Sequence, residues 1–131
     1  MKTCKKYHLR HKGNTFTRVK YAMQCKTVSI LKKTKKILQE LGFKLVKEEQ
    51  SGFKHTFLTF SSFLIILSIG NPKTQKLNHP RVGSHLGFKV SKTKLRELYQ
   101  FCKYKSIIVE KPDETSFFIE LPCGEILEFS G

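Results

Sequence analysis

The sequence predicts an α+β fold in which two βαβββ modules form one domain. The length of 131 residues suits a single domain. The two halves show the same order of strand and helix patterns, and they align on each other at an offset of 62 residues. At that offset Val28-Ser29 falls on Val90-Ser91, and the apolar run 63–68 falls on 125–130. An internal repeat constrains the fold more than the propensity of any one segment.

Each module is expected to begin with a strand that leads into an amphipathic helix. The first strands are expected at 21–28 and 84–90, and the helices at about 30–41 and 92–103. Apolar residues at helical spacing form the buried stripe of the first helix, namely Ile30, Leu31, Ile37, Leu38 and Leu41. Gly42 follows as a C-cap glycine would.

Three short strands should follow each helix. They are rich in Phe, Ile, Leu and Val and are separated by turn residues. The expected ranges are 43–48, 55–60 and 63–69 in the first module and 106–110, 115–121 and 125–130 in the second. The domain then covers 20–131, with modules 20–69 and 83–131 joined by a turn-rich linker at 70–82. Residues 1–19 are expected to form a basic, flexible extension.

The chain is strongly basic, with 25 Lys and Arg against 10 Asp and Glu and a net charge of +15. Residues 1–20 carry seven of the basic residues and no acidic one, so the body keeps 18 basic against 10 acidic residues. Such a field attracts phosphorylated or carboxylated ligands, nucleic acid or an acidic membrane surface. Lysines 32, 33, 35 and 36 form either a solvated helix face or a patch that binds phosphate backbones non-specifically.

Cysteine usage and hydropathy indicate a reduced cytoplasmic protein. The four cysteines lack the close pairing of a zinc ribbon, and a cluster of Cys4, His8 and His11 would lack a fourth ligand. No apolar stretch follows the charged N-terminus, and the longest apolar run, 63–69, is too short to cross a bilayer. We therefore expect no membrane partner.

Several function classes find no support in the sequence. The segment "GNPKTQK" lacks the pattern of a phosphate-binding loop, and there is no RNA-recognition or helix-turn-helix signature. Cys25 and Cys123 have no neighbouring histidine in the sequence and do not begin a helix, so nucleophilic catalysis is not expected.

Three segments resemble the vicinal oxygen chelate superfamily, which includes glyoxalase I, ring-cleaving dioxygenases, fosfomycin-resistance enzymes and bleomycin-resistance proteins. "ILQELGFKLV" resembles its helix-to-strand turn, "HLGFKV" the opening strand of its second module, and "FFIELPCGEILEF" its closing hairpin. The resemblance covers about 21–131. It implies a cleft between two modules that holds a divalent metal, with ligands from the first and last strand of each module.

Carried over by position, the resemblance gives His85 and Glu128 as metal ligands from the second module. The offset of 62 maps them onto Met23 and Ile66 in the first module, and a register shifted by one residue gives Ala22 and Ile65. None of these is a usual ligand for a hard or borderline divalent metal.

A catalytic metal site needs three protein ligands or more, so the expected site is incomplete. Two side chains would hold Mn, Ni, Zn or Fe only weakly. A third ligand would have to come from a second subunit or from the tail, for instance His8 or His11. Without a metal, Glu128 could orient His85 as a general base, or the two could hydrogen-bond a ligand.

Other residues are expected to line the cleft. Lys89 lies four residues beyond His85 on the same strand face and either pairs with an anionic ligand or is an ordinary strand-end lysine. Glu120 joins the face of Glu128 if Pro122-Cys123-Gly124 forms a three-residue loop. Tyr21 and Met23 either line the opposite wall of the cleft or belong to the core. Ile66 lies in an apolar strand, so the cleft surface on the first-module side should be apolar.

These features predict a small-molecule-binding protein of the glyoxalase/bleomycin-resistance type. Its ligand is expected to be anionic and partly apolar, its metal site incomplete, and its assembly a homodimer. One alternative is a metal-dependent lyase, dioxygenase or thiol transferase that uses His85, Glu128 and a ligand from elsewhere. A second alternative is a basic protein that interacts with nucleic acid.

Overall fold

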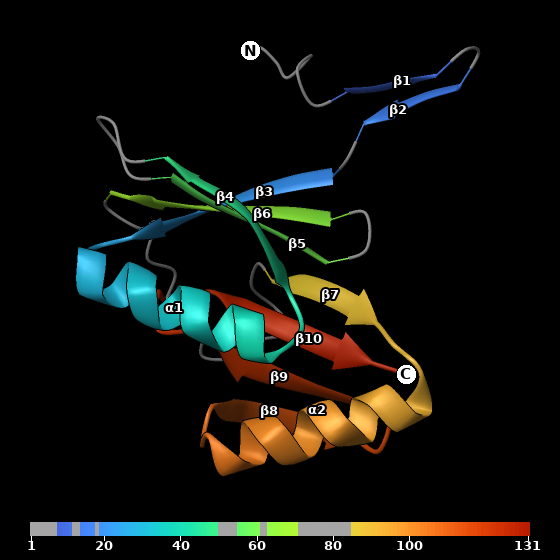
Figure 1. Cartoon of the computed structure of the whole chain (residues 1–131). Coiled ribbons are helices and arrows are strands. Elements are labelled where there is room, and N and C mark those ends of the chain that lie inside the picture. The colour runs from blue at the N-terminus through green and yellow to red at the C-terminus, as the bar shows by residue number, and fades with distance from the viewer. Residues whose placement is uncertain (1–7, 12–13, 18, 50–54, 61–62, 71–84) are drawn as a thin grey trace.

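Two four-stranded sheets, each with one helix, make up the body of the chain (Figure 1). The computed structural model describes residues 8–11, 14–17, 19–49, 55–60, 63–70 and 85–131, and side chains from Lys20 onward within these ranges. The prediction of an α+β fold with two βαβββ modules is confirmed. Among the described residues, no helix has both the length and the apolar character needed to span a membrane.

The first module contains β3 (Val19–Cys25), α1 (Val28–Glu40), β4 (Lys44–Glu49), β5 (His55–Phe60) and β6 (Phe63–Ile69). Its strand order is β3-β6-β5-β4, with β3 parallel to β6 and the other pairs antiparallel. The parallel pair is possible because α1 carries the chain back across the sheet.

Capping side chains and a glycine fix the ends of α1. The Thr27 hydroxyl accepts a hydrogen bond from the Ile30 amide at 3.1 Å. At the other end Gly42 has a φ of +112°, and the Phe43 amide donates to the Leu38 carbonyl at 2.9 Å. This is a Schellman ending, so the expected C-cap glycine is confirmed.

The second module repeats the first. It contains β7 (Leu86–Lys89), α2 (Lys92–Tyr104), β8 (Ile108–Asp113), β9 (Ser116–Glu120) and β10 (Ile126–Ser130). Its order is β7-β10-β9-β8, with β7 parallel to β10. Ser91 caps α2 as Thr27 caps α1. Ser106 takes the left-handed conformation that Gly42 takes in the first module, with a φ of 58°.

One continuous hydrophobic core joins the two modules. The Phe88 ring on β7 lies 5.5 Å from Phe43, 5.5 Å from Phe60 and 5.3 Å from Phe63, all in edge-on geometry. Edge-on aromatic pairs add to the stabilisation from buried area. The modules therefore pack against each other within one chain, and Phe88 is central to their contact.

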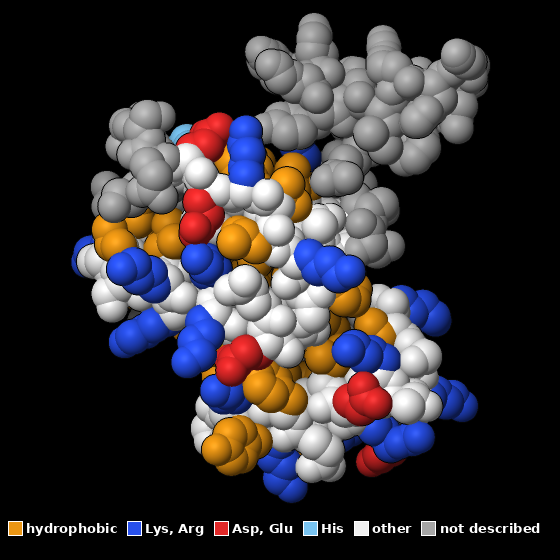
Figure 2. Space-filling model, in the orientation of Figure 1, with side chains coloured by type: hydrophobic (Ala, Val, Ile, Leu, Met, Phe, Trp, Pro, Cys, Tyr) orange, Lys and Arg blue, Asp and Glu red, His pale blue; other side chains and the backbone are white. Residues whose placement is uncertain are grey.

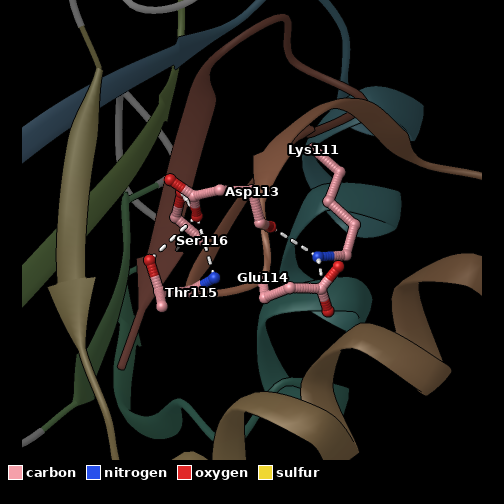
Figure 3. A network of polar contacts seen from close by, with 5 residues as sticks. All are labelled: Lys111, Asp113, Glu114, Thr115 and Ser116. Atoms are coloured by element: carbon pink, nitrogen blue, oxygen red, sulfur yellow. Dashed lines mark hydrogen bonds and ion pairs between the residues drawn. The ribbon is translucent and has the colours of Figure 1, made fainter.

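The turn between β8 and β9 is built by one aspartate (Figure 3). The Asp113 carboxylate accepts from the Thr115 amide at 2.8 Å, from the Thr115 hydroxyl at 2.8 Å and from the Ser116 hydroxyl at 3.3 Å. These hydrogen bonds lower the pKa of Asp113. An aspartate that bonds the backbone two residues on is the usual way such turns are stabilised.

A hairpin that the sequence pattern did not predict lies near the N-terminus. β1 (His8–His11) pairs antiparallel with β2 (Asn14–Thr17) within the segment 1–19, which was expected to be a basic, flexible extension. Strands of four residues give too short a pattern for periodicity to detect. Cys4, the side chains of His8 and His11, and residues 71–82 of the expected linker lie outside the described residues.

Candidate functional site

His85 and Glu128 lie side by side at the parallel strand pair of the second module. His85 precedes β7 and Glu128 is the central residue of β10, and His85 Nε2 is 3.2 Å from Glu128 Oε1. Their side chains are 22% and 27% exposed, so the pair is partly shielded from water. Gly87 is opposite Glu128, and a Cβ there would lie 3.4 Å from Glu128 Oε1. The small residue leaves room for the carboxylate.

The alternation of β10 puts Glu128 on the side of the sheet away from the core. Its neighbours Leu127 and Phe129 are buried in the core cluster, so Glu128 points the opposite way. Phe118 of β9 is directly opposite Glu128, and its ring lies 5.2 Å from the His85 ring in edge-on geometry. Lys89, which is exposed, shares this face four residues beyond His85. We call the set His85, Lys89, Phe118 and Glu128 the module-2 face.

Glu120 also lies on this side of the sheet. The Leu121 amide donates to the Glu125 carbonyl at 2.9 Å, and Gly124 has a φ of +97°. The three-residue loop Pro122-Cys123-Gly124 is therefore formed as expected, and Glu120 is opposite Ile126. Glu120 is exposed and lines a shallow hollow of about 350 Å³ with Ser106, Ile107, Ile108, Val109, Leu121 and Pro122.

The expected first-module residues separate onto two sides of their sheet. Ile66 is half-buried and pairs with Ala22 on the side away from α1. Met23 pairs with Leu67 and is fully buried in the core, on the side that packs against α1. Tyr21 lies on the same side of the sheet as Met23, and its hydroxyl contacts Glu125 of the second module. The structure thus places Met23 and Tyr21 away from Ile66.

The sheet register identifies Lys20 as the first-module counterpart of His85. Glu128 pairs with Gly87 as Ile66 pairs with Ala22, and the residue two positions earlier is His85 in one strand and Lys20 in the other. The sequence offset had pointed to Met23, because the opening strands align at 65 residues rather than 62. The alternating apolar residues Tyr21, Met23 and Cys25 were a signal that could have shown the correct register.

The donor set fits two metal ligands and not a complete centre. With bonds of about 2.1 Å, two ligands of one metal are ~3.0–3.4 Å apart in octahedral or tetrahedral geometry, and the His85–Glu128 separation of 3.2 Å matches this. Within the described ranges, no group of three or more His, Cys, Asp and Glu could hold a metal ion. The pair can chelate, yet the described residues supply too few donors for a tight site.

A polar cluster that sequence reasoning missed lies where the modules meet. The Tyr21 hydroxyl donates to Glu125 Oε1 at 3.0 Å. Burial raises the pKa of Glu125, and burial together with the Glu125 charge raises the pKa of Tyr21 to about 12. Interaction with the Cys123 thiol and burial raise the pKa of Cys25, whereas interaction with the Cys25 thiol lowers the pKa of Cys123.

Comparisons with known proteins identify the fold of the chain but not its activity. No protein-family model matches the sequence, and no curated protein does. Among solved structures, the fosfomycin resistance protein FosX from Listeria monocytogenes is 15% identical, with coverage of 88% of this chain and 89% of that one and a TM-score of 0.67. An integron cassette protein from the Halifax Harbour sewage metagenome is 23% identical, with coverage of 86% and 96% and a TM-score of 0.65.

A third similar structure is described as a possible glyoxalase from Bacillus cereus, at 19% identity, 86% and 96% coverage and a TM-score of 0.64. FosX from Listeria monocytogenes has been solved with Mn(II) and sulfate, and a variant of it with Mn(II) and 1S,2S-dihydroxypropylphosphonic acid. FosX and the glyoxalase-like proteins are members of the vicinal oxygen chelate superfamily. This chain has the fold of that superfamily, arranged as two βαβββ modules.

Proposed function

We propose that the chain binds a small, anionic and partly apolar molecule at the module-2 face. The observation that carries this proposal is the His85–Glu128 pair, held at 3.2 Å in a partly buried position beside the Phe118 ring. A carboxylate that bonds an imidazole fixes the orientation of the ring. The pair is therefore a preorganised set of polar groups next to an apolar surface, as small-molecule sites usually are.

Charge favours an anion as the ligand. Lys89 is exposed on the module-2 face, and Lys20 holds the first-module position that corresponds to His85. Figure 2 shows Lys and Arg side chains spread over the surface at α1 and α2. A positive field raises the local concentration of anions. The sulfate and phosphonic acid bound by FosX support a phosphonate, phosphate or carboxylate as the charged group.

The donor count among the described residues supports binding without metal-dependent turnover. His85 and Glu128 supply two ligands, whereas metal catalysis needs about three protein ligands and an open position. The 3.2 Å separation also favours a second candidate, a metal-dependent lyase, dioxygenase or thiol transferase. That function would require a third ligand from a second copy of the chain or from a residue outside the described ranges. We also expect a homodimer.

A matched ligand series tests the proposal. Phenylphosphonate and benzoate carry an anionic group on an apolar ring, whereas benzyl alcohol and benzylamine carry a neutral and a cationic group on the same ring. We expect the two anions to shift NMR signals or the Tm and the other two to have little effect. His85→Ala and Lys89→Ala should each weaken anion binding about tenfold, which is the loss expected for one charge-assisted hydrogen bond.

Lys36→Ala is the matched control, because Lys36 is an exposed lysine on α1 of the other module. Its removal should leave the affinity unchanged. Binding of benzylamine as strong as that of benzoate, or equal anion affinity in His85→Ala, would remove the basis of the proposal. A different result would indicate a nucleic-acid-type polyanion as the ligand. Binding would then be lost when residues 1–20 are deleted or salt is added, and it would be unchanged in His85→Ala.

A further inference from the structure

The exposed sides of the two helices carry positive charge. We call six exposed residues of α1 and α2 the basic helix face: Lys32, Lys33, Lys36, Lys92, Arg96 and Lys103. Among the residues that the structure describes, none of these six makes an ion pair. Lys35 differs from them, because it pairs with Glu48 at 2.7 Å. The charge of the basic helix face is therefore available to a partner.

The three cations of α2 lie along one stripe of the helix. Arg96 follows Lys92 at position i+4 and Lys103 follows it at position i+11, which places the three side chains within about 40° around the helix axis. The stripe is ~16 Å long, so it covers most of the helix. A linear polyanion can follow such a stripe.

The two helices meet at their C-terminal ends. Lys105, the residue after α2, has its Nζ 3.5 Å from Oε1 of Glu40, the last residue of α1. Figures 1 and 2 show both helices on the same side of the molecule, with Lys and Arg side chains over each of them. One negatively charged chain can therefore contact both helices.

Tyr104 adds an aromatic ring to this surface. It is the last residue of α2, directly after Lys103, and it is 83% exposed. Among the described residues, no other large hydrophobic side chain is as exposed. Proteins that bind single-stranded nucleic acid combine cationic side chains for the phosphates with aromatic rings on which the bases stack. The end of α2 has both features.

We propose that the basic helix face and Tyr104 bind single-stranded nucleic acid without regard to its sequence. The six cationic side chains contact phosphates, and one unpaired base stacks on the Tyr104 ring. This surface lies on the helix side of the sheets. Glu128 points to the other side of its sheet, because its neighbours Leu127 and Phe129 belong to the core. The proposal is therefore independent of the ligand proposed for the module-2 face.

A membrane surface fits the helices less well. A helix that lies on a membrane buries a free apolar side among the lipids. The apolar sides of α1 and α2 are already used in the core, through Leu31, Leu38, Leu95 and Leu98.

A protein partner is also disfavoured, because protein interfaces usually have an apolar centre. On the two helices, only Val28 and Tyr104 are large hydrophobic residues with exposed side chains. Interfaces with nucleic acid are instead polar and strongly positive, as the basic helix face is.

Fluorescence anisotropy of a labelled oligothymidylate tests the proposal on the full-length protein. The affinity is measured over a range of NaCl concentrations. One triple variant carries Lys32→Gln, Lys33→Gln and Lys36→Gln, and a second carries Lys92→Gln, Arg96→Gln and Lys103→Gln. Gln has nearly the helix propensity of Lys and Arg, so the helices should stay intact. Each triple variant should make the slope of log K against log salt less steep by ~2, since each lost phosphate contact removes about 0.7.

Tyr104→Ala separates base stacking from charge. It should weaken binding of the single strand at least about fivefold, which is the loss expected for one stacked base, and leave the salt slope unchanged. Tyr104→Phe keeps the ring and should bind as the wild type does. Neither variant should change the binding of a duplex of the same length, because its bases are already stacked on one another.

The matched control combines Lys44→Gln, Lys47→Gln and Lys111→Gln, which removes the same charge from exposed lysines on β4 and β8. It should change the slope much less than the helix variants do. The proposal is wrong if the wild type does not bind the oligonucleotide at low salt, or if the helix variants bind as the wild type or as the control does. It is also wrong if vesicles of anionic lipid bind the same residues more tightly than the oligonucleotide does.

Discussion

Glu125 is a partly buried carboxyl group whose surroundings favour its neutral form. Burial raises its pKa, and the hydrogen bond from Tyr21 at 3.0 Å offsets only part of that effect. The folded chain therefore holds the Glu125 proton more tightly than the unfolded chain does. At the scale of single residues, this group makes the stability of the contact between the modules depend on pH.

The sign of the effect on stability follows from that shift. The contribution of Glu125 to the free energy of unfolding is fully present below the ordinary glutamate pKa of 4.5 and is lost as the pH rises through the raised value. Glu125→Gln stays neutral and can still accept the Tyr21 hydrogen bond. We expect this variant to equal the wild type at about pH 4 and to be the more stable at about pH 7, by ~1.4 kcal/mol for each unit of pKa shift.

Urea unfolding at both pH values measures the difference in the free energy of unfolding between the variant and the wild type. The titrations that the two proteins share cancel in this difference. Glu97→Gln is the control because Glu97 is exposed on α2. It should show no pH-dependent gain over the wild type. A Glu125→Gln variant that loses stability relative to the wild type as the pH rises from about 4 to about 7 would show that the carboxylate is a stabilising ion and not a burial cost.

Phe88 shows how one strand position couples two modules at the scale of elements. It lies on β7, a four-residue strand, yet its ring contacts rings from β5, β6, β10 and the segment before β4. The Phe88 side chain therefore helps to hold the short strand β7 in place, together with its ladder to β10. Loss of the ring would leave a cavity at the module contact.

We expect Phe88→Ala to lower the free energy of unfolding by about 3–5 kcal/mol, the usual range for a buried Phe. Chemical denaturation followed by far-UV circular dichroism measures this loss. Tyr104→Ala removes an aromatic ring that is 83% exposed and should change stability by less than ~0.5 kcal/mol. Similar losses in the two variants would contradict a core shared by the modules.

Most elements could be predicted from sequence because their signals are local. Gly42 marks the end of α1, Ser91 and Thr27 precede their helices, and Gly124 allows the three-residue loop. The register of β3 could not be predicted from the offset, because the repeat drifts by three residues between the opening and closing strands. The contact of Tyr21 with Glu125 depends on how the modules pack, and no local pattern encodes that packing.

The candidate site was predicted only in the second module. The resemblance to the superfamily gives His85 and Glu128 by position, and the structure brings them to 3.2 Å. The repeat offset of 62 predicts Met23 as the counterpart of His85, but Met23 lies in the core and Lys20 occupies that position. Only the pairing of strands in the folded chain shows that Lys20, and not Met23, is the counterpart of His85.

At the scale of the whole molecule, the two modules differ at corresponding positions, and the chain carries a net charge of +15. The second module presents His85 and Glu128, whereas the corresponding first-module positions hold Lys20 and Ile66. A lysine and an isoleucine cannot complete an oxygen and nitrogen site for a divalent metal. The central claim of the proposed function is that the site binds an anionic, partly apolar ligand without a complete metal centre.

The metal content of the purified, tag-free protein tests this claim most directly. The protein is incubated with Mn, Ni, Zn and Fe salts in turn, desalted, and measured by elemental mass spectrometry. We predict far less than one retained metal per chain or per dimer, in the wild type and in His85→Ala and Glu128→Ala alike. About one retained metal per chain or per dimer, lost in both variants, would contradict the account and indicate metal-dependent chemistry at His85 and Glu128.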